Sequence, residues 1–257
     1  MYPVLLRIGS FEITSFGAMV AIAALVGLWI FRRELARSGL PDQAVDAAIA
    51  GVIGGLVGAK LLWTGEHQGE EPLLSLLLSR GGLSWFGGLV GGIGAGLFVM
   101  LRHKWPVVAV LAAASPALAI GHAIGRIGCF LVGDDYGRPS TLPWAVAFPE
   151  GLPPTTVRVH PTQIYEALAL MPIAWLLFRW RRRRMPDSAV LGAYLIMTSA
   201  IRFLIEFIRI NERVALGLTV AQWASIGLAA AGLWLLRVDR ASARPGATAR
   251  PAKRREA

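Results

Sequence analysis

Seven runs of apolar residues dominate the chain, and each is long enough to cross a lipid bilayer as a helix. A spanning helix needs roughly 20 residues, because the hydrocarbon core is about 30 Å thick. The expected spans are Ser15–Phe31, Ala44–Trp63, Leu83–Leu101, Val107–Ile127, Thr162–Trp180, Val190–Ile208 and Leu218–Leu236. The composition agrees, since 55% of the residues are hydrophobic and only 16% are charged. The sequence therefore predicts an all-α integral membrane protein with seven transmembrane helices.

The basic residues predict how these spans are oriented. Most of the 26 lysines and arginines follow the first, third, fifth and seventh runs, and short cytoplasmic loops carry such an excess. We expect the N-terminus outside, the C-terminus in the cytoplasm and a small external cap at about residues 133–160. Residues 1–236 form the expected membrane domain. Residues 237–257 are polar and basic without apolar periodicity, so they predict a disordered cytoplasmic tail.

Charge and cysteine content exclude several functions. The net charge of +10 follows from this topology and from attraction to anionic membrane lipids, so nucleic acid is not an expected partner. The single cysteine excludes an intrachain disulfide and a multi-cysteine metal site. Cys129, between Gly128 and Phe130, is expected to be a small apolar filler. No metal-ligand spacing is present, and no metal or cofactor is expected.

Glycines at four-residue spacing predict where helices approach one another closely. The pairs are Gly54/Gly58, Gly87/Gly91, Gly88/Gly92, Gly92/Gly96 and Gly121/Gly125. The stretch from Gly81 to Gly88 differs, because two glycines precede a helix start. Ser84 is expected to cap that helix.

The segment Gly125–Arg138 places Arg126, Asp134 and Asp135 at the end of the fourth apolar run. Ionised groups at membrane depth are costly and are therefore functional candidates. A fixed guanidinium in this position suits a lipid phosphate.

Two further groups of polar residues lie near the same predicted surface. Gln163 and Glu166 are three residues apart on one face of the fifth span. Arg202, Glu206 and Arg209 form a charged stripe on the sixth, which should face the bundle interior. A lattice of ion pairs between helices is the alternative, but three arginines exceed what helix pairing needs. We therefore expect an anionic ligand, most simply a phospholipid.

Histidines supply the candidate bases near neutral pH. His160 is the most plausible titratable base, although a local hydrogen-bonding role is an equal alternative. His122 lies within a span and is expected to pack against, or bond to, a neighbouring helix. His67 and His103 are expected to be solvated loop residues.

An ordered series of motifs resembles the bacterial prolipoprotein diacylglyceryl transferase family, over nearly the whole chain to about residue 236. The series comprises Phe16-Gly17, the stretch from Gly82 through Ser84 and Phe86 to Gly88, the segments Gly125–Phe130 and Gly137-Arg138, the segment His160–Glu166, and Arg202 through Glu206 to Arg209. Each piece alone is weak, but their order is specific.

The resemblance implies that the diacylglyceryl group of phosphatidylglycerol passes to the lipobox cysteine of a preprolipoprotein and that glycerol 1-phosphate leaves. It also implies a multi-pass protein of the bacterial inner membrane with its site on the periplasmic side. The implied catalytic residues are Arg126, Arg202, His160 and Asp134. The implied substrate-binding residues are Arg126, Arg209, Glu206, Glu166, Gln163, Tyr165, Gly128, Gly137, Ser84, Phe86 and Phe16.

The chain departs from the usual family pattern at four positions. Phe86 replaces a histidine, Phe16 a tyrosine, Cys129 an asparagine and Asp134 a glutamate. Without that histidine, the thiol proton would pass to His160, Asp134, Glu166 or the phosphate itself. A paralogue with another acceptor and a non-catalytic lipid-binding transporter or scaffold are the alternatives, although a transporter would be expected to carry internal repeats.

Overall fold

The protein is mostly helical, and the computed structural model describes residues 3–8, 11–69, 71–79 and 82–242. The α-helices are α1 (Ser15–Arg37), α2 (Val45–Glu66), α3 (Leu73–Leu78), α4 (Trp85–Arg102), α5 (Val107–Val132), α6 (Thr162–Arg182), α7 (Asp187–Ile205) and α8 (Val220–Ser242). Two single 3-10 turns are η1 (Asp42–Ala44) and η2 (Glu206–Ile208). The strands β1 (Val4–Ile8) and β2 (Phe11–Thr14) form one antiparallel hairpin, and β3 (Val146–Phe148) and β4 (Thr155–Val159) form another.

Several of these helices are suited to a membrane, which makes the chain a multi-pass membrane protein. Four of them, at Ser15–Arg37, Asp42–Glu66, Val107–Val132 and Asp187–Ile208, are long and apolar enough to cross a bilayer by length and composition. The two hairpins are a departure from the all-α prediction. Backbone groups outside helices still need hydrogen-bond partners, and short antiparallel pairing supplies them at the end of the bundle.

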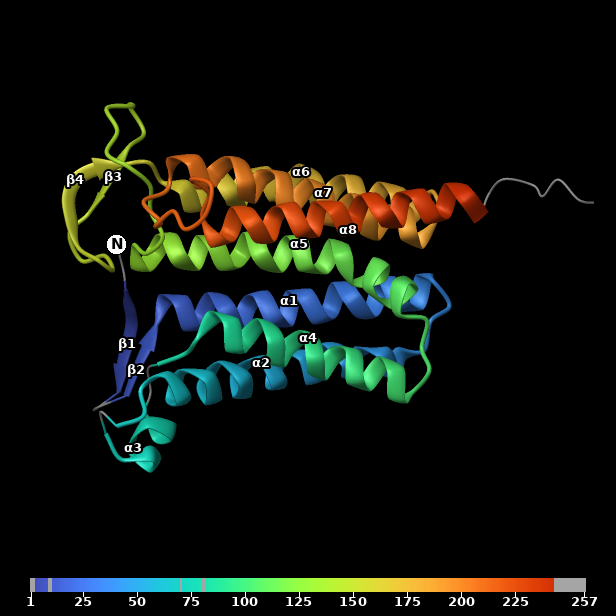
Figure 1. Ribbon diagram of the computed structural model, residues 1–257, viewed down its shortest axis with the longest axis horizontal. Coiled ribbons are helices and arrows are strands. Elements are labelled where there is room, and N and C mark those ends of the chain that lie inside the picture. Colours follow the sequence, from blue (N-terminus) through green and yellow to red (C-terminus); the bar gives the residue numbers. More distant parts are fainter. Residues whose placement is uncertain (1–2, 9–10, 70, 80–81, 243–257) are drawn as a thin grey trace, which may run out of the picture.

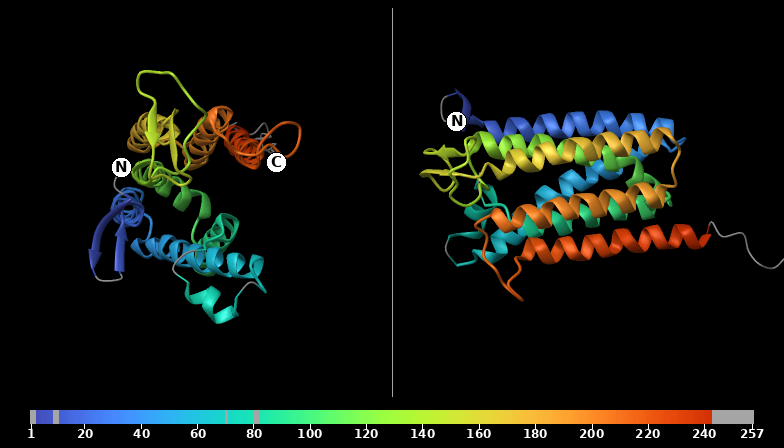
Figure 2. Two further views of the ribbon diagram at one scale, coloured as in Figure 1. Left: turned by 90° about the vertical axis from the view of Figure 1, so that its left-hand side faces the viewer. Right: turned by 90° about the horizontal axis from the view of Figure 1, so that it is seen from above.

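Helix α5 is the central element of the bundle. It contacts α1 on one side and α6 and α7 on the other, while α2 packs on α4 and α7 on α8. The end-on view in Figure 2 shows α1, α2 and α4 on one side of α5 and α6 to α8 on the other. Both hairpins lie at one end of the bundle, and α8 finishes at the opposite end (Figure 1).

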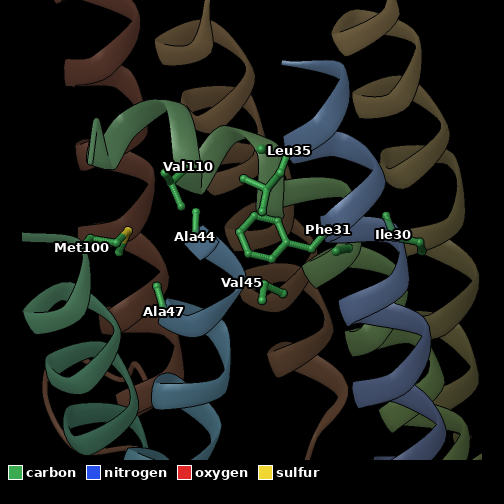
Figure 3. Packing of buried hydrophobic residues seen from close by; sticks show 10 residues of the cluster. Ile30, Phe31, Leu35, Ala44, Val45, Ala47, Met100 and Val110 are labelled. Atoms are coloured by element: carbon green, nitrogen blue, oxygen red, sulfur yellow. The ribbon is translucent and has the colours of Figure 1, made fainter. Parts of the chain in front are cut away.

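The main apolar core lies at the end of the bundle away from the hairpins. Phe31 and Leu35 of α1 meet Val45 of α2, Met100 of α4 and Val110 of α5 (Figure 3). Leu35 is completely buried. The four helices α1, α2, α4 and α5 are therefore joined here by close packing of aliphatic and aromatic side chains.

Glycines bring α2 and α4 into backbone contact, as their spacing predicts. A Cβ atom built on Gly58 would lie 2.4 Å from the carbonyl oxygen of Gly87, and one built on Gly87 would lie 2.2 Å from that of Gly58. Of the pair Gly121/Gly125, only the first glycine meets another helix: a Cβ on Gly121 would lie 3.7 Å from the carbonyl oxygen of Ala23 in α1, whereas one on Gly125 would meet no atom of the described chain within 4 Å. Gly125 faces open space, so its spacing reflects no helix contact.

Ser84 stands at the N-cap position of α4, but its side chain makes no capping hydrogen bond, contrary to the prediction. Its Oγ instead lies 3.5 Å from Oε1 of Glu66, and its backbone N–H donates to the carbonyl of Ala59 at 3.0 Å. The start of α4 is therefore fixed by bonds to α2. Gly81 lies outside the described residues.

The predicted cap, residues 133–160, contains a small core of its own. Tyr136 stacks on the completely buried Phe148, with ring centroids 5.4 Å apart, and Val159 packs beside them. The hydroxyl of Tyr136 donates to the carbonyl of Pro153 at 2.7 Å. These contacts hold the β3–β4 hairpin over the end of α5.

Helix α8 continues past the predicted start of the tail at Arg237 and ends at Ser242. The remaining part of the predicted tail, residues 243–257, lies outside the described residues.

The α2–α4 contact predicts a position-specific effect of alanine. Gly87→Ala places a Cβ against the backbone of Gly58, and we expect it to destabilise the protein by about 1–3 kcal/mol. Thermal unfolding in detergent measures this effect.

Gly94→Ala is the matched control, because a Cβ on this α4 glycine meets nothing within 4 Å. Alanine also has the higher helix propensity, so the control should be neutral or stabilising. Equal destabilisation by both substitutions would contradict the proposed backbone contact.

Candidate functional site

Arg126 lies near the end of α5, and its guanidinium is held between two carboxylates. Its Nη1 is 2.7 Å from Oδ2 of Asp135, and its Nε is 3.1 Å from Oε2 of Glu166. The side chain is 17% exposed. These two ion pairs fix the orientation of the guanidinium through Nη1 and Nε. The third nitrogen, Nη2, lies in the same plane near the end of the helix.

Asp135 was noted in the sequence beside Asp134, but it was not among the expected site residues. Gly133 ends α5 in the left-handed conformation with φ 72°, and Asp135 itself has φ 61°. This turn directs the Asp135 side chain back toward α5, where it bonds Arg126 and also accepts a hydrogen bond from Nη2 of Arg209. The sequence signal was present as a pair of adjacent aspartates, but it did not distinguish the two.

The charges around Asp135 determine its ionisation. Burial opposes the charged form, but Arg209 and Arg126 outweigh this effect and lower the pKa of Asp135 to about 2. Asp135 is therefore ionised at neutral pH and cross-links α5 to the segment that follows α7.

The charged stripe of α7 is only partly helical. Nη2 of Arg202 lies 2.9 Å from Oε2 of Glu206, as the i, i+4 spacing predicts. Arg209 has instead left the helix, with an extended backbone, and its Nε is 3.7 Å from the same carboxylate. The reason is backbone pairing: the N–H of Arg138 donates to the carbonyl of Ile208 at 2.8 Å and draws this segment toward the cap.

The start of α6 supplies the second buried carboxylate. Oε1 of Glu166 is 3.3 Å from Nε2 of His122, so His122 contacts a neighbouring helix as predicted. Gln163, on the same face of α6, donates a hydrogen bond to the backbone carbonyl of Asp134. Thr162 donates to the carbonyl of Asp135 at 2.7 Å. The first turn of α6 thus positions the turn that carries both aspartates.

These contacts link one imidazole, three guanidinium groups and three carboxylates. These residues, hereafter the arginine cluster, are His122, Arg126, Asp135, Glu166, Arg202, Glu206 and Arg209. Its members come from α5, α6 and α7 and from the segments that follow α5 and α7.

Three arginine nitrogens of the arginine cluster have no hydrogen-bond partner among the described residues. One of them, Nε of Arg209, still lies 3.7 Å from Oε2 of Glu206. The other two are Nη1 of Arg202 and Nη1 of Arg209, both buried. Buried N–H groups normally find an acceptor, and an oxyanion is the strongest available to guanidinium. The arginine cluster is therefore suited to an anionic ligand such as a phosphate.

Asp134 forms no ion pair with these arginines in the described chain and lies beside Cys129, whose sulfur is 3.8 Å from Nη1 of Arg126. Its Oδ1 is buried and has no hydrogen-bond partner among the described residues. Burial raises the pKa of Asp134 above its usual value. One thiol sulfur and two carboxylate oxygens, from Cys129, Asp134 and Asp135, lie within 4.8 Å of one another. Asp135 is already shared by two arginines, whose positive charge would oppose a metal ion there.

His160 and Tyr165 form a separate polar group under the cap. Nδ1 of His160 lies 3.3 Å from the hydroxyl of Tyr165, and Nε1 of Trp144 donates to that hydroxyl at 2.7 Å. In the described part of the chain, none of the side-chain hydrogen bonds of His160 or Tyr165 reaches the arginine cluster.

Two of the predicted site glycines are positions of close approach. A Cβ on Gly137 would lie 2.6 Å from the carbonyl oxygen of Ile208. A Cβ on Gly128 would lie 3.0 Å from Cβ of Met19 and 3.4 Å from the ring of Phe16. Phe16 therefore packs beside α5 at Gly128, whereas the contacts of Ser84 lead to α2. Phe86, two residues further along α4, has a half-exposed ring.

The pKa of Asp135 predicts an acid-sensitive contribution to stability. Its value of about 2 lies below the ordinary 3.8, so the ionised carboxylate stabilises the fold above about pH 4, and this stabilisation is lost as the pH falls toward 2. Asp135→Asn should remove this component. Because the side chain is 41% exposed, we expect a change of only about 2–4 °C in the pH-dependent part of the melting temperature.

Thermal melts in detergent from pH 5 to pH 2 measure this difference. Glu212→Gln, which removes an exposed carboxylate after Arg209, is the control and should keep the wild-type profile. An Asp135→Asn protein with the wild-type pH profile would contradict the assignment.

Known proteins are similar in sequence to this chain over nearly its whole length. The family model described as prolipoprotein diacylglyceryl transferase matches residues 3–238. A phosphatidylglycerol–prolipoprotein diacylglyceryl transferase of Methylobacillus flagellatus is 32% identical, over 92% of this chain and 96% of its own. Its counterpart in Bordetella bronchiseptica is 34% identical, over 91% of this chain and 94% of its own. The chain belongs to the prolipoprotein diacylglyceryl transferase family.

Proposed function

We propose that this protein transfers the diacylglyceryl group of phosphatidylglycerol to the lipobox cysteine of preprolipoproteins, the first step of lipoprotein maturation. The observation that carries the proposal is the pair of buried Nη1 atoms, on Arg202 and Arg209, that lack an acceptor within the described residues. An arginine cluster with unused donors, at the end of an apolar helix bundle, suits the phosphate of a membrane lipid. Family membership supports the same reaction.

The phosphate of phosphatidylglycerol would lie against Arg126, Arg202 and Arg209. In the reaction the thiolate sulfur attacks the glyceryl carbon, and the bond from that carbon to the phosphate oxygen breaks. The electron pair goes to the departing glycerol 1-phosphate, which therefore gains negative charge. Fixed guanidinium groups in a low-dielectric site stabilise that charge more than water does. The arginines thus lower the barrier to departure of the phosphate.

The carboxylates of the arginine cluster act as positioning residues in this proposal. Glu206 orients Arg202 through the 2.9 Å ion pair, and Glu166 orients Arg126 through the 3.1 Å one. Because every arginine is paired on one side, each keeps only part of its guanidinium for the lipid. This arrangement keeps the site nearly neutral until the substrate arrives.

The acceptor thiol must lose its proton, and Asp134 is the base that the geometry favours. Glu166 is already engaged by Arg126 and His122, and His160 bonds Tyr165. Asp134 keeps a buried oxygen without a partner in the described chain, and burial raises its pKa. Both properties make it a better proton acceptor than Asp135.

We further propose seven spans with the N-terminus outside and the C-terminus in the cytoplasm of a bacterial inner membrane. Seven α-helices of the described chain have 18 residues or more, and the ends of α1 and α6 away from the hairpins are rich in arginine. The arginine cluster and the cap would then face the periplasm. The lipobox cysteine of a secreted precursor would be presented on that side.

Removing a phosphate-binding arginine tests this function. We expect Arg126→Ala and Arg202→Ala to reduce transfer by at least about 100-fold. Arg126→Lys should restore little activity, because lysine lacks the planar fork that contacts two acceptors. Release of glycerol 1-phosphate from phosphatidylglycerol and a lipobox peptide measures the rate.

Arg102→Ala removes an arginine from the C-terminal end of α4, far from the cluster along the bundle, and should retain activity. Near-wild-type turnover by Arg126→Ala would overturn the phosphate-binding assignment. Phosphatidylglycerol that binds the wild type without release of glycerol 1-phosphate would favour a different acceptor or a non-catalytic lipid-binding role.

The role of Asp134 predicts a change in the pH profile of transfer. Asp134→Asn should lower kcat by about 100-fold or more, and Asp134→Glu should restore part of it, because a carboxylate is again available. The acidic limb of the wild-type profile should disappear in the Asn variant.

His160→Gln is the comparison variant. If it removes the acidic limb while Asp134→Asn keeps it, His160 and not Asp134 accepts the proton.

A further inference from the structure

A second charged site lies at the end of the bundle opposite the arginine cluster. A cavity of about 510 Å³ opens between the C-terminal halves of α1 and α6, within the size range of ligand pockets. Five arginines line it: Arg33, Arg37, Arg179, Arg182 and Arg183. Residues about 140 positions apart in the sequence therefore converge on one hollow.

The positive charge of this cavity is poorly balanced. Its single lining carboxylate, Glu34, is 2.6 Å from Arg37 and 3.5 Å from Arg181. Among the described residues, no carboxylate pairs with the other four lining arginines. The cavity thus keeps a surplus of guanidinium groups that can bind an anion.

Contacts behind the cavity hold its two walls together, which distinguishes it from an ordinary basic loop. Arg181 is 8% exposed and bonds Glu34 of α1, Asp187 of α7 and the hydroxyl of Ser38. Phe178 of α6 packs against the apolar core of Figure 3. The two cavity walls are therefore fixed relative to each other before any ligand binds.

Tryptophans on both walls place the cavity at the depth of lipid headgroups. The guanidinium of Arg33 lies 4.7 Å from the ring centre of Trp29, and that of Arg179 lies 5.5 Å from the ring centre of Trp175. Both rings are more than half exposed. Exposed tryptophans beside arginines are typical of the membrane interface.

An exposed apolar track runs from each tryptophan toward the middle of the bundle. Leu25 precedes Trp29 by one helical turn, and Met171 and Leu168 precede Trp175 by one and two turns. All three side chains are exposed. Residues at these spacings share a helix face, so each track is continuous with the cavity mouth. A small free anion would not contact these apolar side chains, whereas the acyl chains of a phospholipid would.

We propose that this cavity binds the phosphate headgroup of an anionic phospholipid, with the acyl chains lying along α1 and α6. The lipid is held by Arg33, Arg179 and Arg182, in the leaflet opposite the arginine cluster. Its assignment to the cytoplasmic leaflet rests on the proposed orientation. Binding itself is independent of the transferase reaction.

Fluorescence quenching by bromine-labelled lipid tests the proposal. The full-length protein is placed in phosphatidylcholine nanodiscs that contain increasing fractions of phosphatidylglycerol or phosphatidylcholine brominated on the acyl chains. The signal is the difference between the protein and its Trp29→Phe/Trp175→Phe variant, which reports these two tryptophans. We expect brominated phosphatidylglycerol to saturate this signal at a much lower fraction than brominated phosphatidylcholine.

Arg179→Gln/Arg182→Gln should raise the half-saturating fraction of phosphatidylglycerol on the order of tenfold. Arg102→Gln/Lys104→Gln removes the same number of charges from the same end, outside the cavity, and should leave the curve unchanged. Equal quenching by both lipids, or a wild-type curve for the Arg179/Arg182 variant, would overturn the proposal.

Two further measurements distinguish a bound lipid from a bound free anion, and this second site from the proposed enzyme function. Inorganic phosphate should not displace the brominated phosphatidylglycerol, and displacement would identify the ligand as a free anion and overturn the lipid assignment. Transfer activity is measured in the same nanodiscs. Selective quenching without transfer would contradict only the proposed enzyme function, whereas transfer without selective quenching would contradict only this second lipid site.

Discussion

The ion pairs of Asp135 with Arg126 and Arg209 are the interaction on which the site end of the bundle depends. An unpaired charge at membrane depth is costly, so each guanidinium must be close to a carboxylate before the helices can pack. Asp135 serves both arginines and thereby joins α5 to the segment after α7. Glu166 and Glu206 complete the pairing from α6 and η2. The remaining unpartnered nitrogens are then a consequence of this arrangement.

Contacts of the cap and of the ends of α5 and α6 hold the Asp135 side chain in position. Gly133 ends α5 with a left-handed residue, and Gly137 allows the next segment to lie against the backbone of Ile208. Thr162 and Gln163 then bond the carbonyls of the two aspartates. The short turn after α5 is thus fixed on both sides by backbone and side-chain hydrogen bonds. This rigidity keeps the arginines in one geometry.

The two ends of the bundle are stabilised by different forces. Aliphatic packing around Phe31 and Leu35 dominates the end away from the hairpins, whereas polar contacts dominate the end that carries the arginine cluster. Close glycine contacts join α2 and α4 along their length. The apolar core contributes more to stability than the ion pairs, because desolvation offsets much of the energy of each ion pair. The ion pairs instead fix the geometry of the arginine cluster.

The sequence by itself determined the helix bundle, because seven apolar runs and the glycine spacing leave few alternatives in a membrane. It also singled out Arg126 and Arg202 as candidates, since both stand out against apolar surroundings. Only the tertiary structure decided that Asp135 rather than Asp134 bonds the arginines, and that Arg209 leaves its helix to reach a residue 74 positions away. Adjacent carboxylates look alike in a sequence. Their directions are set by the turn after Gly133 and by backbone pairing at Ile208, which are contacts between distant segments.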